Sequence, residues 1–118
     1  MKRSGQIVLA SFPYTDFSDA KLRPVLMLRQ ASTSFDDWLV CMVSSQTQQV
    51  EDGLDEIITP ADANFFDTGL KAPSILRLSR LAVLDGKLLV GSIGAISDER
   101  LMLLRQRLAK WISETPSP

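Results

Sequence analysis

Arg23 is the side chain of this sequence best suited to chemistry, because it lies in a polar loop between two apolar runs and directly precedes Pro24. The 118-residue chain contains no histidine, the residue that most often exchanges protons near neutral pH. Any acid–base or phosphate chemistry must therefore depend on Arg23 and on hydroxyl groups near it. A guanidinium carries a planar fork of donors that matches the oxygens of a phosphate group.

The lack of histidine and the single cysteine exclude several classes of enzyme. A zinc site of Cys and His ligands, a Cys–His nucleophile pair and a Ser–His–Asp triad cannot be assembled. The segment Gly91–Gly94 does not continue into a dinucleotide-binding motif, and no phosphate-binding loop ends in Gly-Lys-Ser/Thr. The acidic stretch from Glu51 to Glu56 could bind a divalent cation, but its spacing fits no defined loop and favours a solvated turn. We therefore expect chemistry that needs no metal or cofactor.

Composition predicts a single soluble domain of residues 1–118. Of these residues 45% are hydrophobic, enough to bury a core without disulfides. Cys41 lies in an apolar run and is expected to be a buried thiol in a reducing compartment. The apolar run after the basic residues Lys2 and Arg3 is too short for a signal peptide, and no segment is long enough to span a membrane. We expect a cytoplasmic protein.

Charge is distributed unevenly along the chain, although the formal net charge is only −1. Residues 1–30 carry a net charge of +3, residues 31–70 of −8 and residues 71–118 of +4. Both ends of the chain could therefore form one basic face for a polyanion, with the acidic middle elsewhere. The alternative is that these charges are ordinary solvated surface.

Short apolar runs separated by turn residues predict a mainly β domain, a small barrel or roll. The Asp85-Gly86 pair suits the left-handed backbone of a type I′ turn and predicts a hairpin between the strands on either side. Gly91 and Gly94 interrupt the next run as bulges or bends would. The expected strands are Gln6–Phe12, Pro24–Leu28, Trp38–Ser44, Leu54–Thr59, Ser74–Leu78, Leu81–Leu84, Lys87–Val90 and Ser92–Ile96.

Residues 97–112 predict a helix, followed by a short tail at 113–118. Ser97 can accept a hydrogen bond from the first turn, and the acidic Asp98 and Glu99 favour the positive end of the helix. Apolar side chains recur at helical spacing, which predicts that this stripe packs on the sheet, with a partner protein as the alternative. The stripe consists of Leu101, Leu104, Leu108, Trp111 and Ile112.

Several short motifs, in order along the chain, resemble the MazF/PemK-type toxins of bacterial toxin–antitoxin systems. The first motif is Gly5-Gln6-Ile7-Val8-Leu9, followed by Phe12-Pro13 and, after a loop to Lys21, by Arg23-Pro24-Val25-Leu26. The others are Val43-Ser44-Ser45-Gln46-Thr47, Leu70-Lys71-Ala72-Pro73-Ser74 and Leu84-Asp85. Each motif alone is short, but their order and spacing from about residue 5 to the end of the helix make the resemblance specific.

The resemblance implies a small SH3-like barrel with a C-terminal helix, usually a homodimer, that cuts single-stranded RNA at short sequences without a metal. It also implies a cognate antitoxin protein as partner. The arginine of the family falls on Arg23, and its hydroxyl residue at a strand end falls on Ser44, where many relatives have threonine. The loop from Tyr14 to Leu22 corresponds to a segment that closes over substrate in the family.

The chemistry of these two residues agrees with RNA cleavage, in which the 2′-hydroxyl attacks the adjacent phosphorus and the 5′-oxygen leaves. We expect Arg23 to stabilise charge on the phosphoryl oxygens, and Ser44 to orient the phosphate or the 2′-hydroxyl. A guanidinium with a pKa above about 12 is a poor proton donor. The general base is not identified: Asp16 or Asp19 in the loop could serve, although both suit turn formation.

Six further residues are candidate contacts to RNA. Two loop aromatic rings could stack bases, because such rings bind single strands with little sequence preference, or they could pack on the barrel. Two basic residues could contact phosphates, and two polar residues after Ser44 could extend the site or form an ordinary strand end. The aromatic candidates are Tyr14 and Phe17, the basic ones Lys21 and Arg77, and the polar ones Ser45 and Gln46.

Two alternatives to a ribonuclease stay open. CcdB-type toxins share the implied fold and poison DNA gyrase through the end of their C-terminal helix, where this chain has Trp111 and Ile112. The tail that follows departs from that pattern, and the matches at Arg23 and Ser44 favour RNA. The second alternative is a non-catalytic member of the family that only binds a partner or nucleic acid.

Overall fold

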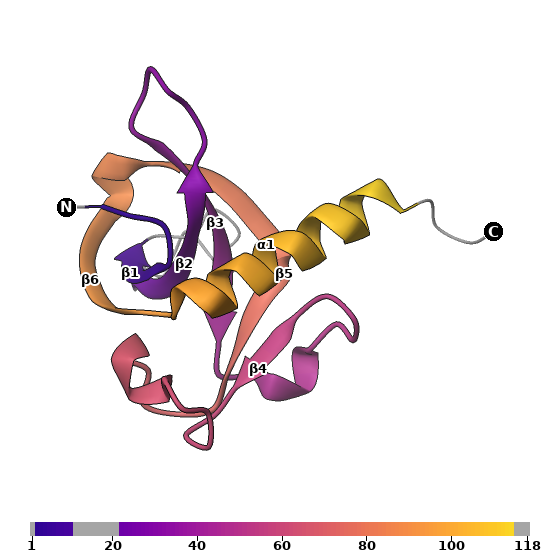
Figure 1. Cartoon of the computed structure of the whole chain (residues 1–118). Coiled ribbons are helices and arrows are strands. Elements are labelled where there is room, and N and C mark those ends of the chain that lie inside the picture. Colours follow the sequence, from indigo (N-terminus) through magenta and orange to yellow (C-terminus); the bar gives the residue numbers. More distant parts are fainter. Residues whose placement is uncertain (1, 11–21, 115–118) are drawn as a thin grey trace.

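Within residues 2–10 and 22–114, which the computed structural model describes, six strands form one antiparallel sheet and a long helix follows them (Figure 1). The strands are β1 (Gln6–Ala10), β2 (Arg23–Gln30), β3 (Asp37–Ser44), β4 (Glu56–Ile58), β5 (Ser74–Asp85) and β6 (Leu89–Ala95). The helix is α1 (Asp98–Ser113), and short 3₁₀ turns are η1 (Thr47–Gln49), η2 (Phe65–Thr68) and η3 (Gly86–Leu88).

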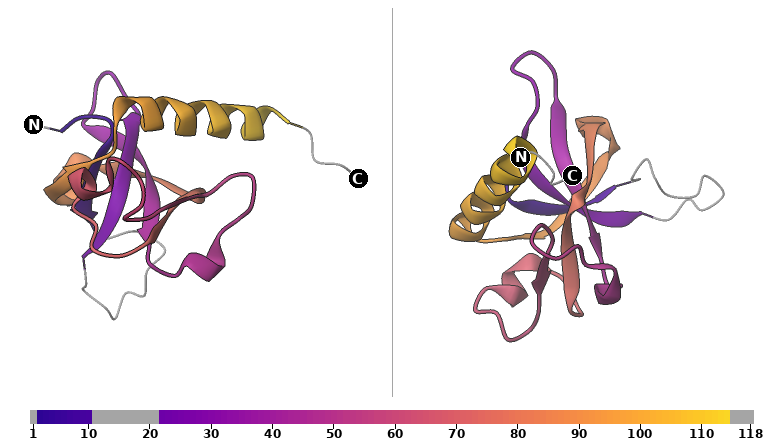
Figure 2. Two further views of the ribbon diagram at one scale, coloured as in Figure 1. Left: turned by 60° about the horizontal axis from the view of Figure 1, so that its bottom comes forward. Right: turned by 90° about the vertical axis from the view of Figure 1, so that its right-hand side faces the viewer.

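The strands lie in the order β4-β5-β3-β2-β1-β6, and each neighbouring pair is antiparallel. The prediction of a mainly β fold with a C-terminal helix is therefore confirmed. The sheet curls strongly (Figure 2), but β4 and β6 are its two edges in the described part of the chain. The barrel is therefore not closed.

Apolar side chains cover both faces of the central strands, because alternate residues of a strand point to opposite faces. On one face, Ile7 and Leu26 pack with the buried leucines of α1, which lies along that side of the sheet in Figure 2. On the other face, Val8, Val25 and Val40 belong to a second core. Burial on both faces explains why these strands are continuous apolar runs in the sequence.

The connection between β5 and β6 differs from the predicted hairpin. Asp85 has a φ of −61°, so the left-handed backbone of a type I′ turn is absent there, and that prediction is wrong. Instead, the carboxylate of Asp85 accepts a hydrogen bond from the N–H of Lys87 at 2.9 Å and caps η3. β6 then pairs with β1, whereas β5 pairs with β3 and β4.

In two places, a pair of strands that the sequence predicted as separate forms one continuous strand with an irregular register. β5 runs through the predicted gap between Leu78 and Leu81, with a register shift against β3 at this point. β6 likewise joins two predicted strands, and its register against β1 shifts twice, next to Gly91 and Gly94. The bulges predicted at these glycines are therefore confirmed.

The start of α1 agrees with the prediction, because the hydroxyl of Ser97 accepts a hydrogen bond from the N–H of Arg100 at 3.1 Å. The leucines of the predicted stripe are buried. The stripe does not continue as predicted: Trp111 is 52% and Ile112 is 64% exposed. The C-terminal end of α1 extends beyond the sheet (Figure 1). None of the described helices has the length and apolar character needed to cross a membrane.

The acidic stretch from Glu51 to Glu56 was predicted to be a solvated turn, and this prediction is wrong for two of its carboxylates. Glu56 lies in β4 and pairs with arginines of α1, and the second is the carboxylate of Asp55. This carboxylate is buried and accepts hydrogen bonds from the N–H of Glu51 and from the N–H and hydroxyl of Ser79, each at 2.9 Å. The predicted burial of Cys41 is confirmed, and this burial, together with the nearby Asp55, raises the pKa of its thiol.

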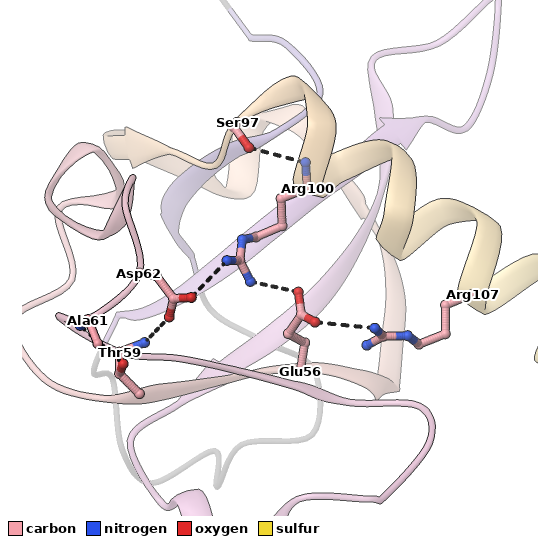
Figure 3. Close-up of polar contacts among 7 residues, drawn as sticks. All are labelled: Glu56, Thr59, Ala61, Asp62, Ser97, Arg100 and Arg107. Carbon is pink, nitrogen blue, oxygen red and sulfur yellow. Dashed lines mark hydrogen bonds and ion pairs between the residues drawn. The ribbon is translucent and has the colours of Figure 1, made fainter.

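Ion pairs join α1 to β4 and to the loop that follows it (Figure 3). The guanidinium of Arg100 lies 2.7 Å from a carboxylate oxygen of Glu56 and 3.1 Å from one of Asp62. Arg107, two turns further along α1, lies 3.2 Å from the other oxygen of Glu56. The acidic middle and the basic C-terminal part of the chain thus partly neutralise each other at this contact.

We expect Asp62 to make stability depend on pH in the acid range. The N–H of Thr59, at 2.7 Å, and then the Arg100 guanidinium hold the pKa of this carboxyl below its ordinary value of 3.8. Asp62 therefore contributes stability above pH 3.8 that is lost as the pH falls towards the lowered pKa. Urea unfolding of the wild type and Asp62→Asn at several pH values should show a weaker acid dependence in the variant. Equal dependence in both proteins would contradict this role.

Candidate functional site

A pocket of about 290 Å³ lies where β2 begins and β3 ends. Arg23, Ser44, Ser45 and Gln46 line it, so four of the residues predicted for the site lie together. The rest of its wall includes residues 70–72 of the loop before β5 and Ser74, the first residue of β5. Three segments far apart in the sequence therefore meet at this pocket.

Strand register explains why Arg23 and Ser44 meet. β2 and β3 are antiparallel, with Val25 opposite Met42. Continuing this register by two residues on each strand places Arg23 opposite Ser44, and directly opposite residues of such a pair project to the same face. Pro24 favours an extended backbone at the residue before it, which suits the start of a strand.

The hydroxyl of Ser44 is held by the turn that follows β3. Its oxygen accepts a hydrogen bond from the N–H of Gln46 at 3.1 Å, a local bond typical of serine at such turns. The side-chain oxygen of Gln46 in turn accepts a hydrogen bond from the amide of Gln48 at 2.9 Å. Because the Ser44 oxygen is the acceptor, its own O–H remains a donor that can point into the pocket.

Lys71, which was not among the residues predicted for the site, also lines the pocket. It lies in the motif Leu70–Ser74, which contributed to the resemblance, so a signal was present. The Ser74 hydroxyl donates a hydrogen bond to the carbonyl of Ala72 at 2.9 Å, which fixes the turn just after the lysine.

The charge of the pocket is suited to an anion. Among the described residues that line it, Arg23 and Lys71 are cationic and none is acidic. Serine hydroxyls supply neutral donors beside them. In residues 2–10 and 22–114, no group of three Cys, Asp or Glu side chains is placed to hold a metal ion. The arrangement can bind a phosphate group and stabilise additional negative charge on it.

Arg77 does not line this pocket. Its guanidinium donates to the side-chain oxygen of Gln49 at 3.2 Å and to the carbonyl of Gln49 at 3.5 Å, and its Nε lies 3.9 Å from the buried carboxylate of Asp55. The structure therefore places it apart from the other candidates. Tyr14, Phe17 and Lys21 lie outside the described residues, as do both carboxylates considered as the general base.

A larger hollow of about 590 Å³ lies between α1 and the end of β2. Its wall is mostly apolar and includes Leu39 and Leu108. The guanidinium of Arg105, which also lines it, donates two hydrogen bonds to the carbonyl of Leu28, at 2.9 and 2.6 Å. This arginine stabilises the contact between helix and sheet, so the smaller pocket is the better candidate for chemistry.

Solved structures of toxins share this fold. An endoribonuclease in complex with its cognate antitoxin, from a mycobacterial species, matches with a TM-score of 0.68, 13% sequence identity and complete coverage of both chains. MazF-mt6, a toxin of Mycobacterium tuberculosis, matches with a TM-score of 0.63 and 16% identity, covering 93% of this chain and 98% of that one. The MazE–MazF structure from Deinococcus radiodurans matches with a TM-score of 0.64 and 17% identity, with 97% of each chain covered.

The sequence itself provides the evidence for the family. No curated protein matches it significantly. In contrast, residues 3–112 match the family model described as PemK-like, MazF-like toxin of type II toxin–antitoxin system. This match includes every strand and nearly all of α1. The chain therefore belongs to the PemK-like, MazF-like toxins of type II toxin–antitoxin systems.

Proposed function

We propose that this chain is an endoribonuclease that cuts single-stranded RNA, including mRNA, without a metal ion. The observation that carries the proposal is the pocket in which Arg23, Lys71 and the Ser44 hydroxyl meet. Such a set of donors fits the phosphate of an RNA backbone. The family and the fold support the same activity.

In the proposed reaction, the 2′-hydroxyl of RNA attacks the adjacent phosphorus and loses its proton to a base. The 5′-oxygen leaves and takes up a proton, so the products end in a 2′,3′-cyclic phosphate and a 5′-hydroxyl. Arg23 binds the phosphoryl oxygens and stabilises the charge that builds on them in the transition state. Ser44, whose oxygen is already bonded to the Gln46 N–H, donates its O–H to the same phosphate.

Binding of the RNA strand extends beyond these two residues in our proposal. Ser45 and Gln46 line the pocket and contact the nucleotides on either side of the cut. Tyr14, Phe17 and Lys21 are proposed to stack bases and bind phosphate from the loop before β2, as the resemblance implies.

The proposed partners follow from the family. A cognate antitoxin would cover the pocket and keep the enzyme inactive, and the similar structures include toxins solved with such partners. We also propose that the protein acts in the cytoplasm as a homodimer.

A CcdB-like gyrase poison is the second candidate. The observation in its favour is that Trp111 and Ile112 are exposed at the end of α1, where the gyrase-binding segment of that family would lie. The phosphate-binding character of the pocket has no use in that mechanism. RNA cleavage is therefore the preferred proposal.

The decisive experiment is incubation of the purified protein with several long single-stranded RNAs in EDTA. We expect discrete cuts whose products carry 2′,3′-cyclic phosphate ends. Absence of cutting on every RNA would contradict the proposal, and inhibition of DNA gyrase supercoiling by the same protein would then favour the gyrase-directed alternative.

We expect Lys71→Ala to weaken RNA binding by up to about tenfold and to lower the salt dependence, because each lost phosphate contact reduces the slope of log K against log salt by about 0.7 for a single strand. Binding of wild type and variant to a 2′-O-methyl RNA, which lacks the attacking hydroxyl, measures both quantities. Lys87→Ala is the matched control, because Lys87 is exposed on η3 and does not line the pocket. An unchanged salt slope in Lys71→Ala would contradict the phosphate contact.

A further inference from the structure

Arg77 projects from β5 towards η1, the short turn that follows the end of β3. Its side chain is only 12% exposed. Two of its nitrogens donate to the same residue, Gln49, one to the side-chain oxygen at 3.2 Å and one to the backbone carbonyl at 3.5 Å. Arg77 therefore fixes both the backbone and the side chain of the last residue of η1.

The base of this guanidinium is buried beside a carboxylate, although its Nε makes no hydrogen bond within the described part of the chain. Its Nε is buried and lies 3.9 Å from a carboxylate oxygen of Asp55, whose side chain is fully buried. Asp55 is fixed by its hydrogen bonds to Glu51 and Ser79. A charged group that is buried and paired in this way has little freedom to turn towards a ligand in solvent.

A chain of hydrogen bonds leads from Arg77 to the pocket. Gln49, held by the arginine, donates its N–H to the carbonyl of Gln46 at 3.0 Å. Gln46 donates its own N–H to the hydroxyl oxygen of Ser44 at 3.1 Å. The position of the Ser44 hydroxyl therefore depends on where Arg77 holds η1, through one backbone–backbone hydrogen bond and one bond from a backbone N–H to the hydroxyl oxygen.

We propose that Arg77 is a positioning residue: it holds η1 so that Gln46 orients the Ser44 hydroxyl towards the bound phosphate. The proposal rests on the ribonuclease function proposed above. It replaces the predicted contact between Arg77 and RNA by a role that acts through Ser44. The two roles differ in what they require, since a phosphate contact needs the positive charge, whereas positioning needs the forked donors that reach both oxygens of Gln49.

Kinetics on a short RNA with one mapped cut site separate the two roles. Positioning predicts that Arg77→Ala lowers kcat by about 10- to 100-fold, because a small misplacement of a reacting group is costly, with little change in KM and in the salt slope. Arg77→Lys should not restore kcat, because an ammonium cannot replace the fork. Gln49→Ala, which removes no charge, should lower kcat in the same way, and the double variant should be no worse than Arg77→Ala.

A phosphate contact predicts the opposite pattern. KM would rise in Arg77→Ala, the salt slope would fall by about 0.7, Arg77→Lys would keep most of the activity, and Gln49→Ala would behave as the wild type. Any of these results would overturn the positioning role. Thermal unfolding of each variant must show a folded protein, and Gln49→Ala provides the test if Arg77→Ala fails to fold.

Amide hydrogen exchange tests the same proposal without RNA. In Arg77→Ala the N–H groups of Gln46 and Gln49 should exchange faster than in the wild type, whereas that of Ile96, bonded to the carbonyl of Gly5 at 2.9 Å, should be unchanged. Unchanged exchange at both glutamines would refute the proposal. This measurement needs no substrate. If the protein failed to cut RNA, the ribonuclease function would be refuted, but the exchange rates would still show whether Arg77 orders η1.

Discussion

Arg23→Ala should reduce RNA cleavage by at least about 100-fold, the loss typical when one donor to a developing anion is removed. In the pocket, this guanidinium lies at the start of β2, opposite the Ser44 end of β3. Lys71 is the other cation of the described lining, and a single ammonium cannot bind two phosphoryl oxygens in a planar fork. The rate of cleavage under single-turnover conditions measures the loss directly.

Conservative variants make this prediction specific. Arg23→Lys keeps the charge but not the fork, so it should recover only part of the lost rate. Ser44→Thr keeps the hydroxyl and should remain active, whereas Ser44→Ala should lose activity. Equal cleavage by the wild type and Arg23→Ala would show that the site is assigned to the wrong residue or that a contaminating nuclease cuts the RNA. Circular dichroism of each variant controls for loss of the fold.

Those parts of the fold that depend on local pattern could be predicted from the sequence. The strand around Val25 follows from an apolar run in the sequence. The helix cap at Ser97 follows from a hydroxyl residue placed just before an acidic first turn. The prediction of a hairpin at Asp85 was wrong. It relied on two residue types that favour a type I′ turn, but in the structure β6 pairs with the distant β1. Pairing between distant strands leaves no local signal.

The candidate site likewise contains residues that could be predicted from the sequence and residues that could not. The chemistry of its side chain singled out Arg23, the resemblance added Ser44, and the register of adjacent strands brings the two together. Lys71 lies in a motif that contributed to the resemblance, but its position in the pocket depends on how a long loop packs against the sheet, which the sequence pattern does not reveal. The buried role of Asp55 was also beyond prediction, because its partner Ser79 lies 24 residues away and a carboxylate in an acidic stretch is normally solvated.

Gly94→Ala should destabilise the protein by about 1 to 3 kcal/mol, the usual cost of adding a methyl group to a tightly packed site. A Cβ on Gly94 would collide with backbone atoms of Asp67 and Thr68 in η2, which cannot move aside as a flexible side chain could. Across the same contact, Gly69 has a φ of 75° and its own Cβ position is blocked by the backbone of Ile93. The close contact between η2 and β6 therefore requires glycine at both positions, Gly94 on β6 and Gly69 at the end of η2.

The same substitution should also lower RNA cleavage, because the pocket wall at Leu70 and Lys71 follows directly after Gly69. Urea unfolding and cleavage rates, measured well below the midpoint of unfolding, separate loss of folded protein from displacement of the wall. Gly91→Ala is the matched control on the same strand, because no atom lies within 4 Å of its Cβ position. If both variants were equally stable, η2 would not be held against β6 by this close contact. If Gly94→Ala were less stable but fully active, the pocket wall would be independent of η2.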